Sequence, residues 1–157
     1  RHIHAVCALA QKTRGTVSLP GALRAVRRGD VVRIMPVRQM DEICLTPEKT
    51  VQFGAYTVIL ARKISDIHSS FKHYSVAYDT INSLWLTVRT WRASDRMTLP
   101  GARGARSLKR LYAERGIPPE IRDSLPVLCC GDTIIAAAGI GTDSQFYGNT
   151  GVFAVSP

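Results

Sequence analysis

The chain has 157 residues, 45% of them hydrophobic, and it carries 21 Lys and Arg against 12 Asp and Glu, a net charge of +9. These numbers allow a packed core for one domain or two small ones and exclude wholesale disorder. No apolar run approaches the roughly 18–20 residues of a membrane span, and no signal peptide is visible. We therefore predict a cytoplasmic protein without a membrane segment, and the initial Arg1 suggests a piece of a longer protein.

The positive charge lies in two blocks. Residues 1–40 contain eight basic and one acidic residue, and residues 84–123 contain nine and four, whereas the two remaining segments are slightly negative. Arg accounts for 16 of the 21 basic residues, and Arg is suited to bidentate contacts with phosphate. The distribution favours basic faces for an anionic partner over a domain that is basic only for solubility.

The first half of the chain predicts a helix followed by strands. Residues 1–12 have helical spacing without an N-terminal cap, which is typical of a truncated helix, and Gly15 is its predicted C-cap. Residues 16–19, 23–28 and 31–35 predict a β-meander with turns at Pro20-Gly21 and Gly29-Asp30. Residues 50–53 and 56–64 predict a hairpin, and the polar residues 65–72 predict a linker. The predicted domains are therefore residues 1–72 and residues 73–157.

The second half mixes strands and short helices. Residues 73–78 predict a short strand, and residues 84–91 predict a strand whose core side holds Leu86 and Val88. Ser107 is the predicted N-cap of a helix over residues 108–115 that Gly116 closes, and Pro119 opens a shorter helix over residues 120–125.

Two apolar strands follow, over residues 126–130 and 133–138, joined by a Gly131-Asp132 turn. Residues 141–157 lack charge and pattern, which predicts a mobile tail or an edge strand. Runs of strands with segregated helices define the α+β class, here a truncated helix and a β-meander followed by a small mixed α/β domain.

The loop over residues 101–107 brings backbone N–H groups and two arginines to the start of a helix, an arrangement that favours an anion. It lacks the Gly-Lys-Ser/Thr ending of a nucleotide P-loop. The alternative is a flexible, solvated loop. We predict RNA binding through phosphates, with these residues as the candidate RNA-binding set: Arg89, Arg92, Arg96, Arg103, Arg106, Lys109, Arg110 and Arg115.

Three neighbouring side chains have competing interpretations. Trp85 and Trp91 could stack on exposed bases, but strand tryptophans are more often core residues, and we favour that for both. Arg122 is basic too, but a local pair with Asp123 would remove it from an RNA-binding face.

No pattern of catalytic or metal-binding residues emerges. No Ser-His-Asp, Cys-His or G-x-S-x-G arrangement is present, and the four cysteines have no C-x-x-C spacing, so we expect buried, reduced thiols. The His2-x-His4 pair points to different faces of a helix, which disfavours a metal site. We predict no catalytic residue, no metal and no cofactor in this chain.

Three segments resemble one family. LTVRTWRASDRM, SLKRLYAERGIPPEIRDSLPVL and GDTIIAAAGI, within residues 86–140, are similar to the C-terminal domain of bacterial tRNA(Ile)-lysidine synthetase (TilS), and residues 1–36 resemble the end of its central region more weakly. The resemblance implies a fold related to a domain of the phenylalanyl-tRNA synthetase β subunit. One position departs from the pattern: Ser94 stands where the family has Gly before Asp-Arg, and a positive φ there would strain Ser by about 1 kcal/mol.

The resemblance also implies a function for the parent protein. It is an ATP-dependent ligase that attaches lysine to the wobble cytidine of tRNA(Ile), with ATP and Mg²⁺ in an N-terminal domain whose S-G-G-x-D-S motif this chain lacks. The part present would bind the tRNA acceptor stem without catalysing the reaction. The alternatives are an interdomain or protein-binding module, including a homodimer, and an unrelated enzyme.

Overall fold

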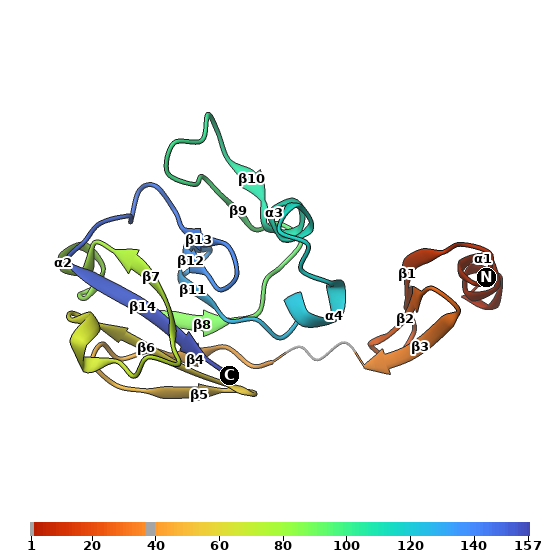
Figure 1. Ribbon diagram of the computed structural model, residues 1–157, viewed down its shortest axis with the longest axis horizontal. Coiled ribbons are helices and arrows are strands. Elements are labelled where there is room, and N and C mark those ends of the chain that lie inside the picture. Colours follow the sequence, from red (N-terminus) through yellow and green to blue (C-terminus); the bar gives the residue numbers. More distant parts are fainter. Residues whose placement is uncertain (1, 37–39) are drawn as a thin grey trace. The chain divides into compact units, whose positions relative to one another are not determined.

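The computed structural model describes residues 2–36 and 40–157, and each of these two ranges forms a compact unit. Each unit is considered by itself (Figure 1). The predicted boundary between residues 72 and 73 does not separate them. The segment expected to be a linker lies inside the larger unit, because the strands on either side of it pair with the same third strand.

The smaller unit is a helix packed on a three-stranded meander. Helix α1 (His2–Ala10) precedes β1 (Arg14–Leu19), β2 (Leu23–Arg28) and β3 (Val31–Pro36), which form an antiparallel sheet in the order β1-β2-β3. The sequence prediction is confirmed here, since Gly21 and Gly29 adopt the positive φ that the two tight turns require. Gly15 is not a C-cap but lies within β1.

The larger unit is built from antiparallel sheets with a few short helices. The α+β class is confirmed to this extent, namely that strands and short helices occur together in one unit. Its five-stranded sheet has the order β13-β12-β11-β8-β4, its four-stranded sheet has the order β5-β6-β14-β7, and β9 and β10 form a separate pair. The strands are β4 (Ile43–Cys44), β5 (Val51–Phe53), β6 (Tyr56–Ala61), β7 (Lys72–Val76), β8 (Thr87–Arg89), β9 (Arg96–Met97), β10 (Arg106–Ser107), β11 (Val127–Cys130), β12 (Thr133–Ala137), β13 (Gly141–Thr142) and β14 (Gly151–Ser156). The helices are the 3-10 turn η1 (Ile64–Asp66), α2 (Tyr78–Ile81), α3 (Leu108–Glu114) and α4 (Pro119–Arg122).

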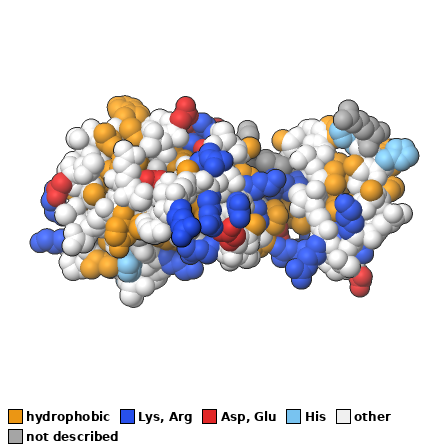
Figure 2. Space-filling model, turned by 90° about the horizontal axis from the view of Figure 1, so that it is seen from above, with side chains coloured by type: hydrophobic (Ala, Val, Ile, Leu, Met, Phe, Trp, Pro, Cys, Tyr) orange, Lys and Arg blue, Asp and Glu red, His pale blue; other side chains and the backbone are white. Residues whose placement is uncertain are grey.

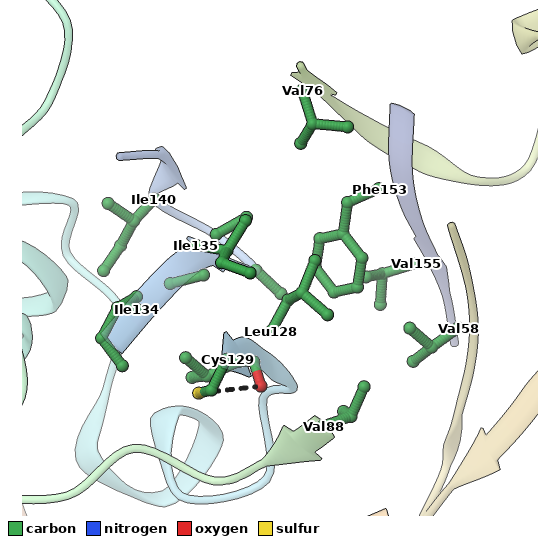
Figure 3. Close-up of a cluster of buried hydrophobic side chains, with 14 of the residues drawn as sticks. Val58, Val76, Val88, Leu128, Cys129, Ile134, Ile135, Ile140, Phe153 and Val155 are labelled. Carbon is green, nitrogen blue, oxygen red and sulfur yellow. Dashed lines mark hydrogen bonds between the residues drawn. The ribbon is translucent and has the colours of Figure 1, made fainter. Parts of the chain in front are cut away.

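The core of the larger unit lies between the two main sheets. Val88, Leu128 and Ile135 from the five-stranded sheet face Val58 and Phe153 from the four-stranded sheet (Figure 3), and all five side chains are completely buried. Full burial of side chains of this size contributes about 1.5–3 kcal/mol each. This core is the platform from which the β9–β10 segment and α3 project.

The interpretation of residues 141–157 as a mobile tail or an edge strand holds for Gly141–Thr142, which form the edge strand β13, but it is wrong for residues 151–156. Strand β14 pairs with β6 on one side and β7 on the other, and all its residues are buried. The absence of alternation has a physical reason, because a central strand covered on both faces is apolar throughout. Gly151 is required there, since a Cβ atom would lie 2.9 Å from the Ala61 carbonyl oxygen.

Candidate nucleic-acid interface

Residues 96–115 form the most basic surface of the larger unit, which we call the basic arm. It comprises β9, the loop that follows, β10 and α3, and it contains six Lys or Arg residues and one acidic residue. All six cationic side chains are exposed. Figure 2, which looks onto the side of the unit where α3 and β10 lie in Figure 1, shows Lys and Arg side chains gathered there. The cations are Arg96, Arg103, Arg106, Lys109, Arg110 and Arg115.

Both ends of α3 are fixed as the sequence predicts. The Ser107 hydroxyl accepts a hydrogen bond from the Arg110 backbone N–H at 3.3 Å, which caps the start. At the other end Gly116 has φ +68°, its N–H bonds to Ala113, and the Ile117 N–H bonds to the Tyr112 carbonyl at 2.9 Å. These two bonds make a Schellman motif. A helix of only seven residues is therefore held in one position by its caps.

The apolar residues of α3 face the core, so the basic residues of the helix face solvent. Leu108, Leu111 and Tyr112 are buried, and the Tyr112 ring packs edge-on against Trp91 with centroids 6.4 Å apart. Because these positions face the core, Lys109 and Arg110 occupy the solvent side of the helix. Burial of Tyr112 raises the pKa of its hydroxyl.

A buried ion pair holds the base of the basic arm. The Arg89 guanidinium donates two hydrogen bonds of 2.8 Å to the Asp95 carboxylate, and both side chains are almost completely buried. The Asp95 carboxylate also accepts a hydrogen bond from the Arg92 backbone N–H at 2.6 Å. The backbone carbonyl of Asp95 accepts one from the Leu108 N–H at 2.9 Å. Hydrogen bonding to Asp95 raises the pKa of Arg89. This pair joins β8 of the main sheet to the first residue of α3.

The structure therefore places Arg89 away from the RNA-binding surface for which it was predicted. Only 2% of Arg89 is exposed, because β8 lies between β11 and β4 and both its faces are covered. Arg122 is also buried, but it donates to the Ile117 carbonyl at 2.7 Å and to the Lys109 carbonyl at 3.4 Å. Backbone carbonyls in and after α3 therefore hold the Arg122 side chain away from the surface, so its burial does not depend on Asp123 alone.

Two arginines of the arm converge on its single carboxylate. The Glu114 carboxylate accepts from Arg110 at 2.9 Å and from Arg106 at 3.0 Å. The Arg110 hydrogen bond is the main cause that lowers the pKa of Glu114. Arg96 donates to the Ala105 carbonyl at 2.9 Å and so braces the loop. These contacts orient the guanidinium groups before any ligand arrives.

The remaining predicted residues differ in their availability. Within residues 2–36 and 40–157, no hydrogen bond or ion pair engages the side chains of Arg103, Lys109 or Arg115. Arg92 lies beside the arm and contacts Glu42 at 3.4 Å and Asp132 at 3.8 Å. A phosphate can therefore bind Arg103, Lys109 and Arg115 without breaking an existing hydrogen bond or ion pair of these side chains.

The expected strain at Ser94 is not present. Ala22 and Glu48 are the non-glycine residues with positive φ in the described part of the chain, and Ser94 is not among them. The turn before Asp95 is accommodated instead by the Asp95 N–H bond to the Arg92 carbonyl at 3.0 Å. A side chain at position 94 is therefore compatible with the Arg89–Asp95 pair.

The tryptophans and cysteines also differ in part from expectation. Trp91 is half-buried and donates to the Asp123 carboxylate at 3.0 Å, whereas Trp85 is 76% exposed and not a core residue. Cys129 is buried, as expected, but Cys7 and Cys44 are exposed. Trp85 is exposed because it lies in the exposed segment of residues 83–85 that precedes β8.

The described residues contain no cluster of three or more His, Cys, Asp or Glu side chains that could hold a metal ion. No helix among the same residues is long and apolar enough to span a membrane. What the geometry offers is a rigidly supported surface of cations.

Comparison with known proteins identifies the class of domain. Residues 86–153 match the family model described as the TilS substrate C-terminal domain. A crystal structure of a TilS C-terminal domain shares the fold, with a TM-score of 0.53 and 22% sequence identity over 74% of this chain and 95% of that one. Residues 86–153, a little under half of the chain, are thus similar to the TilS C-terminal domain family.

The similar full-length proteins are tRNA(Ile)-lysidine synthases. The chain is 43% identical over 54 residues to that of Methylococcus capsulatus, 42% identical over 50 residues to that of Shigella flexneri, and 44% identical over 50 residues to that of Salmonella typhi. These matches cover 34%, 32% and 32% of this chain but only 12% of each relative. The chain is therefore similar to a short part of these enzymes.

Proposed function

We propose that this chain is the tRNA-binding C-terminal portion of an ATP-dependent tRNA(Ile)-lysidine synthetase and that the basic arm binds the tRNA acceptor stem. The observation that carries the proposal is the exposure of six cations and one carboxylate within residues 96–115, a segment that includes a helix fixed at both ends. The match of residues 86–153 to the TilS C-terminal domain family supports tRNA as the anion. A cytoplasmic location accords with this role.

The arm suits a double-stranded RNA stem physically. The major groove of A-form RNA is too narrow to read, so proteins hold such stems through phosphates and 2′-hydroxyls across the shallow minor groove. Arg103, Lys109 and Arg115 supply charge for phosphates, and the Glu114-oriented Arg106 and Arg110 supply fixed donors. Each neutralised phosphate contributes about 0.7–0.9 to the slope of log K against log salt.

In this proposal catalysis belongs to the rest of the parent enzyme. ATP, Mg²⁺ and lysine would bind in an N-terminal domain that this chain does not include, and the ligation to the wobble cytidine would occur there. No residue of this chain is assigned a catalytic role. The related fold in the phenylalanyl-tRNA synthetase β subunit likewise stays a prediction.

The test is a salt titration of tRNA binding with a charge-matched control. Lys109→Ala with Arg110→Ala removes two cations from α3, and Lys49→Ala with Lys63→Ala removes two exposed lysines near β5 and β6, at the other side of the larger unit from α3 (Figure 1). Filter binding of a tRNA(Ile) transcript should show weaker affinity and a slope reduced by about 1.4–1.8 for the α3 variant. If both variants bind like the wild type, the basic arm does not bind tRNA.

A protein-binding role is the second candidate, and one observation favours it. Trp85 is 76% exposed and the adjacent Leu84 is 36% exposed, and exposed aromatic side chains are typical of interface anchors. The partner would be the N-terminal catalytic part of the enzyme or a second copy of this chain. Trp85→Ser should then weaken association with the separately produced N-terminal part, or lower the dimer fraction in sedimentation, while leaving the tRNA salt slope unchanged.

A further inference from the structure

Asp143 joins the five-stranded sheet to the end of β9. Its carboxylate accepts hydrogen bonds from the Thr98 backbone N–H at 2.8 Å and from the Gln145 N–H at 2.9 Å, one on each oxygen. The backbone N–H of Asp143 donates to the Ile135 carbonyl in β12 at 2.8 Å. A half-buried carboxylate that is 45 residues away from Thr98 in the sequence therefore binds the backbone of the basic arm.

Thr98 marks the point where β9 ends and the exposed loop of the basic arm begins. Met97 before it is 2% exposed, whereas residues 100–106 are all exposed. The Thr98 carbonyl accepts from the Ser144 N–H at 2.7 Å, so residues 143–144 bind both backbone polar groups of Thr98. In Figure 1 the chain between β9 and β10 extends away from the sheets beyond this point. These bonds thus hold the root of the loop.

The other end of the loop, which comprises residues 99–105, is closed within the arm. There Arg96 donates to the Ala105 carbonyl at 2.9 Å. Between the two ends the loop makes a turn at Pro100-Gly101, where the glycine has φ +79°. Arg103 is the cation of this loop and is exposed. The bonds at the two ends therefore determine where the loop presents Arg103.

A role confined to the local turn accounts for only half of the side-chain contacts of Asp143. The bond to Gln145 shapes the turn after β13, and Asn or Ser at position 143 would serve such a turn as well. The bond to Thr98 has no part in that turn, and a carboxylate makes it stronger than a neutral acceptor would. Asp143 also adds a negative charge, which by itself opposes the binding of a polyanion. The bond to Thr98 therefore needs a separate explanation.

We propose that Asp143 is a positioning residue for RNA binding, which holds the root of the loop over residues 99–105 so that Arg103 meets a phosphate in a fixed place. Asp143 itself does not touch the RNA. The proposal rests on the function proposed above, since it names a residue that the basic arm needs in order to bind tRNA. The physical basis is the cost of ordering, because a loop that is already fixed loses less conformational entropy on binding than a loop that the ligand must fix.

The test compares Asp143→Ala with Asp79→Ala in filter binding of a tRNA(Ile) transcript by the whole chain. Both variants remove one carboxylate, but Asp79 is an exposed residue of α2 whose side chain contacts Arg62. Loss of a hydrogen bond to a charged group should weaken binding by Asp143→Ala about tenfold. Asp79→Ala should bind as tightly as the wild type or more tightly, because it loses only negative charge. The two variants should thus differ although their net charges are equal.

Two further measurements separate positioning from a loss of folding. In Asp143→Ala the backbone bond from residue 143 to Ile135 remains, so the sheet should keep its structure. Amide hydrogen exchange should therefore be faster at Ala102, within the loop, and unchanged at Leu128, in the core strand β11. Asp143→Asn keeps one acceptor oxygen, so it should recover part of the affinity that Asp143→Ala loses, although both variants have the same charge.

The outcomes distinguish this proposal from the proposed function. If Lys109→Ala with Arg110→Ala weakens binding but Asp143→Ala binds like Asp79→Ala, the basic arm binds tRNA and the positioning role of Asp143 is wrong. The role is also wrong if faster exchange extends to Leu128, because the loss of binding then comes from unfolding. If the Lys109 and Arg110 variant binds like the wild type, the proposed function and the positioning role are both overturned.

Discussion

Replacing Asp95 by Asn tests whether the buried ion pair holds the base of the basic arm. The substitution preserves size and one acceptor oxygen, but it leaves the Arg89 guanidinium, whose side chain is 3% exposed, facing a neutral amide. Removing one partner of a buried pair costs about 3–5 kcal/mol, because water cannot reach the charge that remains. Since the Asn oxygen still accepts from the Arg92 N–H, we expect the lower end, about 3 kcal/mol.

The assay is urea unfolding followed by tryptophan fluorescence. Both tryptophans, Trp85 and Trp91, lie in the larger unit, so the signal reports on that unit. Asp132→Asn, at a fully exposed aspartate, is the matched control and should change the free energy of unfolding by less than about 0.5 kcal/mol. A cost below about 1 kcal/mol for Asp95→Asn would refute the reasoning. Adding Arg89→Met should recover part of the loss, because no buried charge then lacks a partner.

Three further predictions concern α3 and the core. Gly116→Ala should cost about 1–2 kcal/mol in urea unfolding because of its φ of +68°, whereas Gly104→Ala, at ordinary φ and with open space around it, should be neutral; equal effects would contradict the Schellman assignment. Ser107→Ala should cost about 1 kcal/mol by removing the cap, and Ser107→Asp should retain that stability. Burial raises the pKa of Cys129 to about 12, so the unfolded chain releases this proton first and stability should fall as pH rises above about 9; unfolding titrations from pH 8 to 11 should show a shallower fall in Cys129→Ala.

The sequence predicts best those features that depend on neighbouring residues. The Gly131-Asp132 turn, the Ser107 cap and the Gly116 C-cap were all found, because each is a local conformational preference that the surrounding fold does not oppose. The basic arm was found for a similar reason. Charges cluster along its sequence as they do on its surface, so composition alone indicates five of its arginines and Lys109.

What the sequence does not predict depends on distant partners. Arg89 alternates with apolar residues like an outward-facing side chain, and only the position of Asp95 beneath it and the cover from β11 and β4 show that it is buried. The predicted domain boundary between residues 72 and 73 differs from the structure for a related reason. Residues 65–72 are polar like a linker, but β6 and β7 on either side are joined through β14, which no local pattern reveals.

The position of β14 also has a consequence for how the chain is made. Its two partners, β6 and β7, are synthesised long before it and cannot hydrogen-bond to each other across the gap that it fills. While translation proceeds, each of them presents an open edge that is prone to pairing with other chains. The four-stranded sheet is completed only when residues 151–156 have left the ribosome. A premature stop just upstream of Gly151 therefore leaves every residue of the basic arm in place and still yields a polypeptide that cannot close its core.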